Sequence, residues 1–174
     1  MKAIVISEDG LSVKEIDKPL VGESSLLIKV MAAGICGTDL AIVSGSLKTP
    51  MPLILGHEFS GEVAERGRSI GDIAVGTRVT GEINLTCGRC HFCEAGFPTH
   101  CLNRKAIGID VNGAFADYIA VPAKNIHFLV APLGAPHSSP YPLGYIAFSM
   151  ASSPPSLAQA GSLEQSLFEP AVYK

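Results

Sequence analysis

The apolar and polar positions of residues 1–129 alternate over short runs, which predicts a domain built mainly of β-strands. Glycines separate these runs, and short strands joined by glycine turns are typical of a barrel or a sandwich. The alternation in LSVKEID favours a strand with one face buried. One short helix is predicted over residues 37–45, with Thr38 or Asp39 near its start. We expect strands over residues 2–6, 11–17, 24–35, 59–67, 76–83 and 113–126.

The composition changes after this β-rich part. Between Asn125 and Gly161 the chain has no lysine, arginine, aspartate or glutamate, and prolines recur throughout. Prolines without periodicity disfavour both helix and sheet, so residues 130–161 are predicted to be a proline-rich, uncharged insertion or loop. Charge returns in SLEQSLFEPAVYK, and residues 162–174 are predicted to start a helix.

Overall charge and hydropathy argue against three classes: nucleic-acid-binding, membrane and secreted proteins. The net charge of −3 argues against a protein that binds nucleic acid electrostatically. No apolar run approaches the ~18 residues that a membrane span needs, and the first ten residues are too acidic for a secretory signal. We therefore expect a cytoplasmic protein with neither nucleic-acid nor membrane partners.

Four of the five cysteines lie in one run, TCGRCHFCEAGFPTHC. Cysteines crowded in a reducing compartment bind metal more often than they form disulfides. Four thiolates close a tetrahedral zinc site without an open position, which is a structural site. An iron–sulfur cluster is one alternative, although its fourth cysteine usually follows after three residues rather than seven; four unligated thiols are the other. The proposed ligands are Cys87, Cys90, Cys93 and Cys101.

A second set of metal-binding side chains is less distinct. The fifth cysteine is Cys36, and His57 and Glu58 follow some twenty residues later. A lone buried cysteine is usually a small apolar residue, and a lone histidine usually forms hydrogen bonds in the core. Taken alone, these residues do not define a site.

Five motifs together resemble the zinc-dependent alcohol dehydrogenases, which are medium-chain dehydrogenase/reductases. They occur in the same order as in that family and cover about residues 1–129; a weaker similarity resumes at residues 162–174. The resemblance implies a GroES-like barrel with a zinc-binding lobe, followed in the family by a Rossmann domain that binds the cofactor. The motifs are GICGTDL, PLILGHEFSGEV, GTRV, the four-cysteine run and GAFADYIAVPAKNI.

The resemblance also implies roles for individual residues around two zinc ions. Cys36 and His57 match ligands of a catalytic zinc, and Glu58 matches an acid beside that zinc. Thr38 matches the hydroxyl that passes on the substrate's proton, and Asp39 matches the carboxylate that orients the ligand histidine. Four cysteines match the structural zinc site: Cys87, Cys90, Cys93 and Cys101.

One further ligand depends on the helix at residues 162–174. If SLFEP matches the family's helix, Glu169 becomes the third protein ligand of the catalytic zinc. The alternative is a surface carboxylate near the end of the chain.

The expected function is the zinc-binding, substrate-side domain of an NAD(P)-dependent alcohol or polyol dehydrogenase, similar to threonine and sorbitol dehydrogenases. The sequence contains no G-x-G-x-x-G turn, so we expect a truncated chain that is inactive alone. NAD or NADP, and any homo-oligomer, would then belong to a full-length enzyme. The alternative is a non-catalytic, zinc-stabilised β-domain that acts as a binding or structural module.

Overall fold

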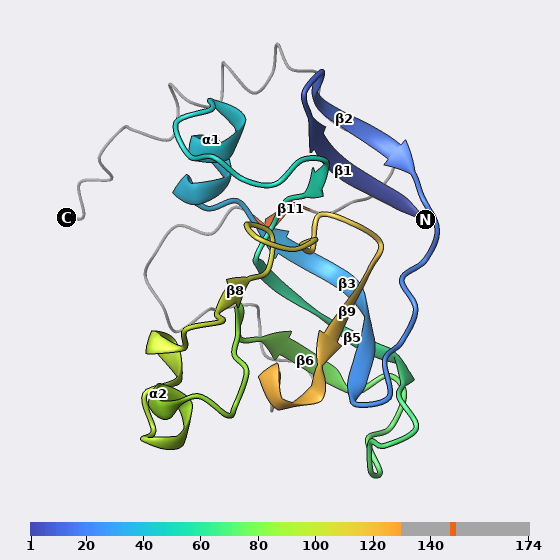
Figure 1. Ribbon diagram of the computed structural model, residues 1–174. Helices are drawn as coiled ribbons and strands as arrows, with labels where there is room; N and C mark the ends of the chain where they lie inside the picture. The colour runs from blue at the N-terminus through green and yellow to red at the C-terminus, as the bar shows by residue number, and fades with distance from the viewer. Residues whose placement is uncertain (130–146, 149–174) are drawn as a thin grey trace, which may run out of the picture.

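The computed structural model describes residues 1–129 and 147–148. Within these residues the secondary structure is mainly strand, with two short α-helices and two 3-10 turns (Figure 1). The helices are α1 (Gly37–Val43) and α2 (His91–Glu94), and the 3-10 turns are η1 (Pro98–His100) and η2 (Ala123–Asn125). The strands are β1 (Lys2–Ser7), β2 (Gly10–Glu15), β3 (Ser25–Gly34), β4 (Leu53–Ile54), β5 (Glu58–Arg66), β6 (Arg78–Gly81), β7 (Asn84–Leu85), β8 (Lys105–Ala106), β9 (Tyr118–Pro122), β10 (Ile126–Phe128) and β11 (Ala147–Phe148).

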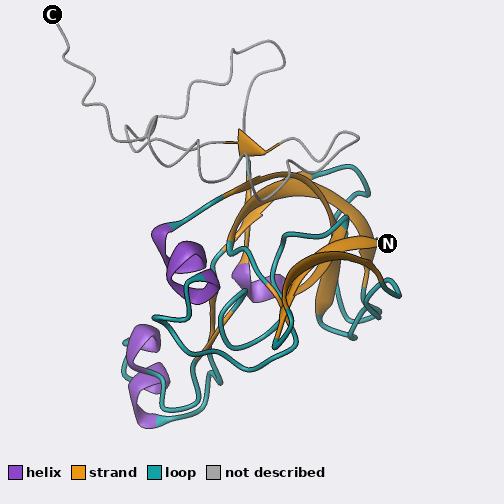
Figure 2. Ribbon diagram, turned by 90° about the horizontal axis from the view of Figure 1, so that it is seen from above, coloured by secondary structure: helices purple, strands orange, loops and turns teal. Residues whose placement is uncertain are grey.

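The largest sheet is antiparallel and has the order β10-β6-β5-β3-β11, with β9 also paired to β3. Seen from above, its strands curl into a partial barrel (Figure 2). A smaller sheet with the order β2-β1-β4 lies beside it. The predicted fold class, mainly β with a curled sheet and few short helices, is therefore confirmed.

Strand β3 forms the centre of the core because it has partners along both edges. Leu26, Leu27 and Ile28 are each fully buried, so the strand has no solvent-facing side over this stretch. The buried residues of β5, β6 and β9 include Val63, Val79 and Val121, and these pack in the same cluster as Leu26. The sequence from residue 24 to 35 predicts this strand correctly, because its run of apolar residues is typical of a central strand.

Two of the predicted strands differ from the structure. The half-buried strand expected over residues 11–17 exists as β2, but most of it is exposed, and Val13 is 48% exposed. The reason is its place at the edge of the smaller sheet, where only one neighbour covers it. The strand expected from residue 113 begins only at Tyr118, because residues 112–115 run as irregular backbone beside residues 54–56.

A small lobe projects from the barrel between β7 and β8. These two-residue strands pair with each other, and the chain between them forms α2 and η1 (lower left in Figure 1). Apart from these short elements the lobe is irregular, and its backbone hydrogen bonds are local ones, such as that from the Cys101 amide to the Pro98 carbonyl.

Several sequence-based predictions fall largely outside the described residues. These are the insertion at residues 130–161, apart from β11 within it, the helix at residues 162–174, and the ligand Glu169. Among the residues that the structure does describe, no helix has the length and apolar character to cross a membrane.

Candidate metal centres

Cys36, His57 and Glu58 come together because of the register between β3 and β5. Gly34 at the end of β3 pairs with Glu58 at the start of β5. Cys36 follows Gly34 by two residues, and His57 directly precedes Glu58, so all three lie at one end of the ladder. Their donor atoms lie within 4.8 Å of one another. The GICGTDL and ILGHEFSG motifs are separated in the chain, but the fold brings their metal-binding side chains into one cluster.

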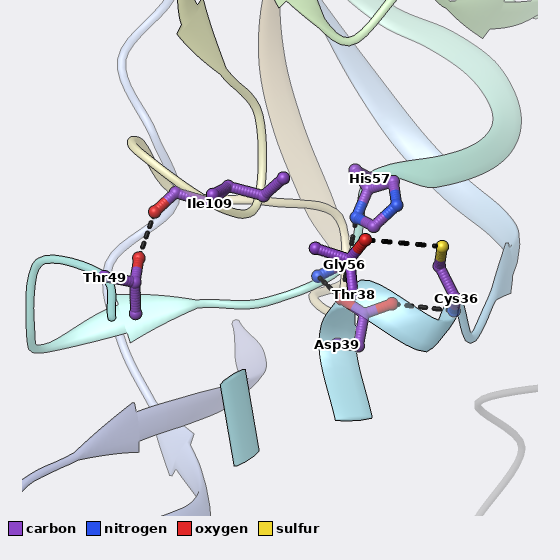
Figure 3. A network of polar contacts seen from close by, with 7 residues as sticks. All are labelled: Cys36, Thr38, Asp39, Thr49, Gly56, His57 and Ile109. Carbon is purple, nitrogen blue, oxygen red and sulfur yellow. Dashed lines mark hydrogen bonds and ion pairs between the residues drawn. The ribbon is translucent and has the colours of Figure 1, made fainter. Parts of the chain in front are cut away.

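Asp39 connects the two segments that carry these residues (Figure 3). Its Oδ2 accepts a hydrogen bond from the Cys36 amide at 2.8 Å, and its Oδ1 accepts one from the Gly56 amide at 3.2 Å. Asp39 lies in the first turn of α1 and is only 2% exposed. A buried carboxylate needs such donors because burying an unpaired charge is costly. Asp39 therefore fixes the backbone next to both Cys36 and His57.

His57 is buried beside the Asp39 carboxylate. Its Nδ1 lies 3.6 Å from Asp39 Oδ1, and this nitrogen has no hydrogen-bond partner among the described residues. The carboxylate raises the pKa of His57 to about 9; burial opposes this rise, and the neighbouring Cys36 adds to it. With Nδ1 toward Asp39, the other ring nitrogen is the one available to a metal ion.

The residues around Cys36 lower the pKa of its thiol and so favour the thiolate form. Burial raises the pKa of the Cys36 thiol, but hydrogen bonds with the backbone and hydroxyl of Thr38 and the proximity of His57 outweigh this, so the net pKa is lowered. Cys36 Sγ and Thr38 Oγ1 lie 3.7 Å apart. A thiolate is the form of cysteine that binds metal. Thr38, predicted from the sequence, thus lies directly beside this donor.

The four cysteines of the lobe form a second cluster. Their sulfur atoms lie within 4.8 Å of one another, and all four are free thiols rather than disulfides. Cys87 and Cys101 sulfurs are 3.5 Å apart, and those of Cys90 and Cys93 are 3.6 Å apart. Zinc at ~2.3 Å from each of four sulfurs in a tetrahedron would separate them by about 3.8 Å. The spacing therefore fits one tetrahedral ion.

The electrostatics of the lobe also fit a cation. The backbone amide of Arg89 lowers the pKa of Cys87 to about 6. Desolvation, followed by the neighbouring Cys90, raises the pKa of Cys93 to about 11. Neighbouring thiolates repel each other, so all four ionise together only when a positive ion lies among them. Such a donor set matches the soft, closed environment of a structural zinc.

The sequence did not reveal every residue that shapes the first cluster. Gly56 is buried and carries the amide that binds Asp39, while Gly108 and Gly113 approach its carbonyl oxygen. No motif marks these glycines as related, because they meet only through the tertiary fold. Glu169, by contrast, was predicted as a ligand but lies outside the described residues.

Comparison with known proteins identifies the family. Residues 22–131 match the family described as "Alcohol dehydrogenase GroES-like domain". Over 132 residues the chain is 46% identical to L-threonine 3-dehydrogenase of Streptomyces avermitilis, covering 72% of this chain and 39% of that protein.

Solved structures agree with this result. A protein of Sinorhizobium meliloti 1021, assigned as a zinc-binding dehydrogenase and bound to NADP, has a TM-score of 0.70 and 44% identity, over 76% of this chain and 38% of its own. A thermostable alcohol dehydrogenase of Pyrobaculum aerophilum with bound cobalt and zinc has a TM-score of 0.70 and 35% identity, over 76% and 42% of the two chains. The chain thus spans about two fifths of each relative's length. It belongs to the zinc-dependent alcohol dehydrogenase family, of which it forms the N-terminal, GroES-like domain.

Proposed function

We propose that this chain is the zinc-binding, substrate-side domain of an NAD(P)-dependent dehydrogenase that acts on a small alcohol or polyol. The main support for the proposal is the cluster of Cys36, His57 and Glu58. The buried Asp39 accepts hydrogen bonds from the backbone beside Cys36 and His57. One thiolate and one imidazole leave further positions on a zinc ion open for substrate, as a catalytic site requires.

Two zinc sites are part of this proposal. Cys87, Cys90, Cys93 and Cys101 would hold a structural zinc in the lobe. Cys36 and His57 would hold the catalytic zinc, with Glu58 beside it and Glu169 as the candidate third ligand. Residues 1–129 would form the zinc-binding domain, residues 130–161 an insertion or loop, and residues 162–174 the start of a helix toward a cofactor domain.

The side chains of the cluster have distinct tasks. A zinc ion bound there would make the hydroxyl of an alcohol more acidic. Cys36 and His57 hold the site, and Asp39 keeps the His57 ring oriented through its position 3.6 Å from Nδ1. The Thr38 hydroxyl, 3.7 Å from Cys36 Sγ, would accept the proton of the substrate hydroxyl and pass it outward. Glu58, whose carboxylate lies within 4.8 Å of the other two donor atoms, would be the acid beside the zinc.

The hydride acceptor would be NAD or NADP, bound by a cofactor domain that the relatives' additional length provides. Holding the nicotinamide within reach of the reacting carbon contributes ~7–11 kcal/mol in well-oriented systems. We therefore expect the 174-residue chain alone to be inactive. The substrate class follows the L-threonine 3-dehydrogenase relative, which points to a secondary alcohol, in the group of threonine and polyol substrates.

The test is a gain of activity. The purified chain and a fusion of it to the cofactor domain of a related dehydrogenase are assayed for NAD(P)H formation with L-threonine and a panel of polyols. Turnover by the fusion alone, lost in a fusion with His57→Ala, supports the proposal. A fusion that binds two zinc ions but turns over no alcohol would favour a non-catalytic, zinc-stabilised module instead.

A further inference from the structure

The peptide groups on both sides of Gly56 are held by other parts of the chain. Its amide donates to Asp39, and its carbonyl oxygen accepts a hydrogen bond from the Ala114 amide at 2.8 Å. Residues 112–115 continue this contact along residues 54–56. The Ile54 amide donates to the side chain of Asn112 at 3.1 Å, and the Gly113 amide donates to the Ile54 carbonyl at 2.8 Å.

Two glycines allow this contact to be so close. A Cβ atom on Gly113 would lie 2.1 Å from the Gly56 oxygen, and one on Gly108 would lie 2.4 Å from the same atom. Both values are far below any normal contact distance for a carbon atom. Gly108 also has a φ of +72°, which other residues rarely adopt, whereas Gly113 is outside that region. Steric room alone therefore requires glycine at position 113.

The Gly56 oxygen is linked rigidly to His57. A carbonyl group and the next residue's amide nitrogen belong to one planar peptide unit. The oxygen that Gly108 and Gly113 approach therefore moves together with the backbone nitrogen of His57. Figure 3 shows how near Gly56 lies to the imidazole and to Asp39. Any side chain that displaces this oxygen rotates the peptide plane from which the ligand histidine extends.

We propose that Gly108 and Gly113 are positioning residues for the Cys36–His57 metal site, acting through the Gly56–His57 peptide. This inference rests on the proposed function, because it assigns a role toward the metal that His57 would hold. Gly108 and Gly113 contact the carbonyl oxygen of Gly56, and Asp39 accepts a hydrogen bond from its amide, so both peptides that flank Gly56 are held in place. The lobe cysteines are not among these contacts.

The test compares Gly113→Ala with Gly71→Ala. Gly71 is a matched control, because its backbone is likewise outside the left-handed region and a Cβ there meets nothing within 4 Å. The 174-residue protein with one equivalent of Zn²⁺ in the lobe is titrated with Co²⁺, whose visible absorption reports the Cys36–His57 site. We expect Gly113→Ala to weaken Co²⁺ binding by ~10–100-fold and to shift the absorption band. Gly71→Ala should match the wild type, and identical curves for both variants would overturn the inference.

Two further measurements keep the inference testable if Gly113→Ala folds poorly. Asn112→Ala removes only an exposed side chain and its bond to the Ile54 amide. It should weaken Co²⁺ binding several-fold without loss of the lobe zinc; wild-type binding in this variant would count against the inference.

The second measurement does not need a metal. After chelation, NMR should show the His57 ring resonances shifted in Gly113→Ala but unchanged in Gly71→Ala. Unshifted resonances in both would refute the positioning role. Wild-type protein that takes up zinc only in the lobe would instead refute the proposed catalytic site, so the two failures can be told apart.

Discussion

Asp39 Oδ1 lies 3.6 Å from His57 Nδ1, and both residues are buried, with 2% of Asp39 and 5% of His57 exposed. This buried pair shares its carboxylate with the amides of Cys36 and Gly56. The same carboxylate therefore sets both the backbone geometry and the proton affinity of the cluster.

Replacing Asp39 by Asn should lower the pKa of His57. The carboxylate is the main cause that raises this pKa to about 9, and an amide carries no charge to replace it. In Asp39→Asn the His57 ring should titrate near or below its ordinary value of 6.5. An NMR titration of the chelated protein measures this directly. A pKa that stays near 9 would show that the carboxylate is not the cause.

The stability of the chelated protein should depend on pH through the same pair. Because the folded-state pKa of His57 is raised, its stabilisation is fully present below about pH 6.5 and is lost as the pH rises through 9. The difference in unfolding free energy between wild type and Asp39→Asn should therefore narrow over this range. Urea titrations at pH 6 and pH 9.5 measure it. An equal difference at both values would contradict the assignment.

Zinc binding at Cys36 and His57 should respond to pH in the opposite direction. A metal needs the neutral imidazole, so zinc must displace the proton that His57 holds up to a pKa of about 9. The histidine alone should raise zinc affinity by about tenfold per pH unit below 9. In Asp39→Asn, whose His57 pKa should be near or below 6.5, this pH dependence should be absent above about pH 6.5. Competition with a chromogenic chelator between pH 6.5 and 9 measures how zinc affinity changes with pH in the wild type and in Asp39→Asn.

Loss of one lobe cysteine should release one zinc and loosen the lobe alone. In Cys93→Ser we expect half of the bound zinc to be lost and residues 86–105 to become sensitive to protease, because the ion supplies the local folding energy. Cys36→Ser is the matched control: it should also lose one zinc but keep the lobe resistant. Equal protease resistance of both variants would mean that no ion stabilises the lobe.

Core stability should depend on the centre of β3. Leu26 is 0% exposed and Leu20 is 93% exposed, so they form a matched pair for truncation. Leu26→Ala should cost ~2–5 kcal/mol of unfolding free energy, because it leaves a cavity in the core. Leu20→Ala should change it by less than ~0.5 kcal/mol. Equilibrium denaturation at saturating zinc provides the comparison, and similar costs for both would contradict the core assignment.

Local patterns were sufficient to predict much of this protein. The four lobe cysteines lie close in the chain, so their spacing alone indicates a shared ion. The apolar run at residues 24–35 predicts the long strand β3, and GTDLAIVSG predicts the short helix α1, which ends two residues earlier. In each case the interactions that matter are near in sequence, which is why the sequence alone reveals them.

Other features depend on contacts between distant segments, and sequence patterns do not contain these. The alternation at residues 11–17 predicts the strand correctly but its buried face wrongly, since burial depends on β2 being at a sheet edge. Residues 113–115 belong to the predicted strand, yet they form hydrogen bonds with residues 54–56 as irregular backbone. The approach of Gly113 to Gly56 depends on the complete fold.

The pairing of Gly34 with Glu58 has a consequence for how such a domain can diversify. The ladder, together with Asp39, aligns Cys36 and His57, so the loop at residues 44–52 does not set the distance between them. Lengthening a surface loop costs little, with each doubling adding only ~0.6 kcal/mol. This loop lies between α1 and β4, and its Thr49 forms a hydrogen bond with the Ile109 carbonyl. A longer loop can therefore be inserted here without changing the distance between the Cys36 and His57 donor atoms, as long as the contact between Thr49 and Ile109, next to Gly108, is kept.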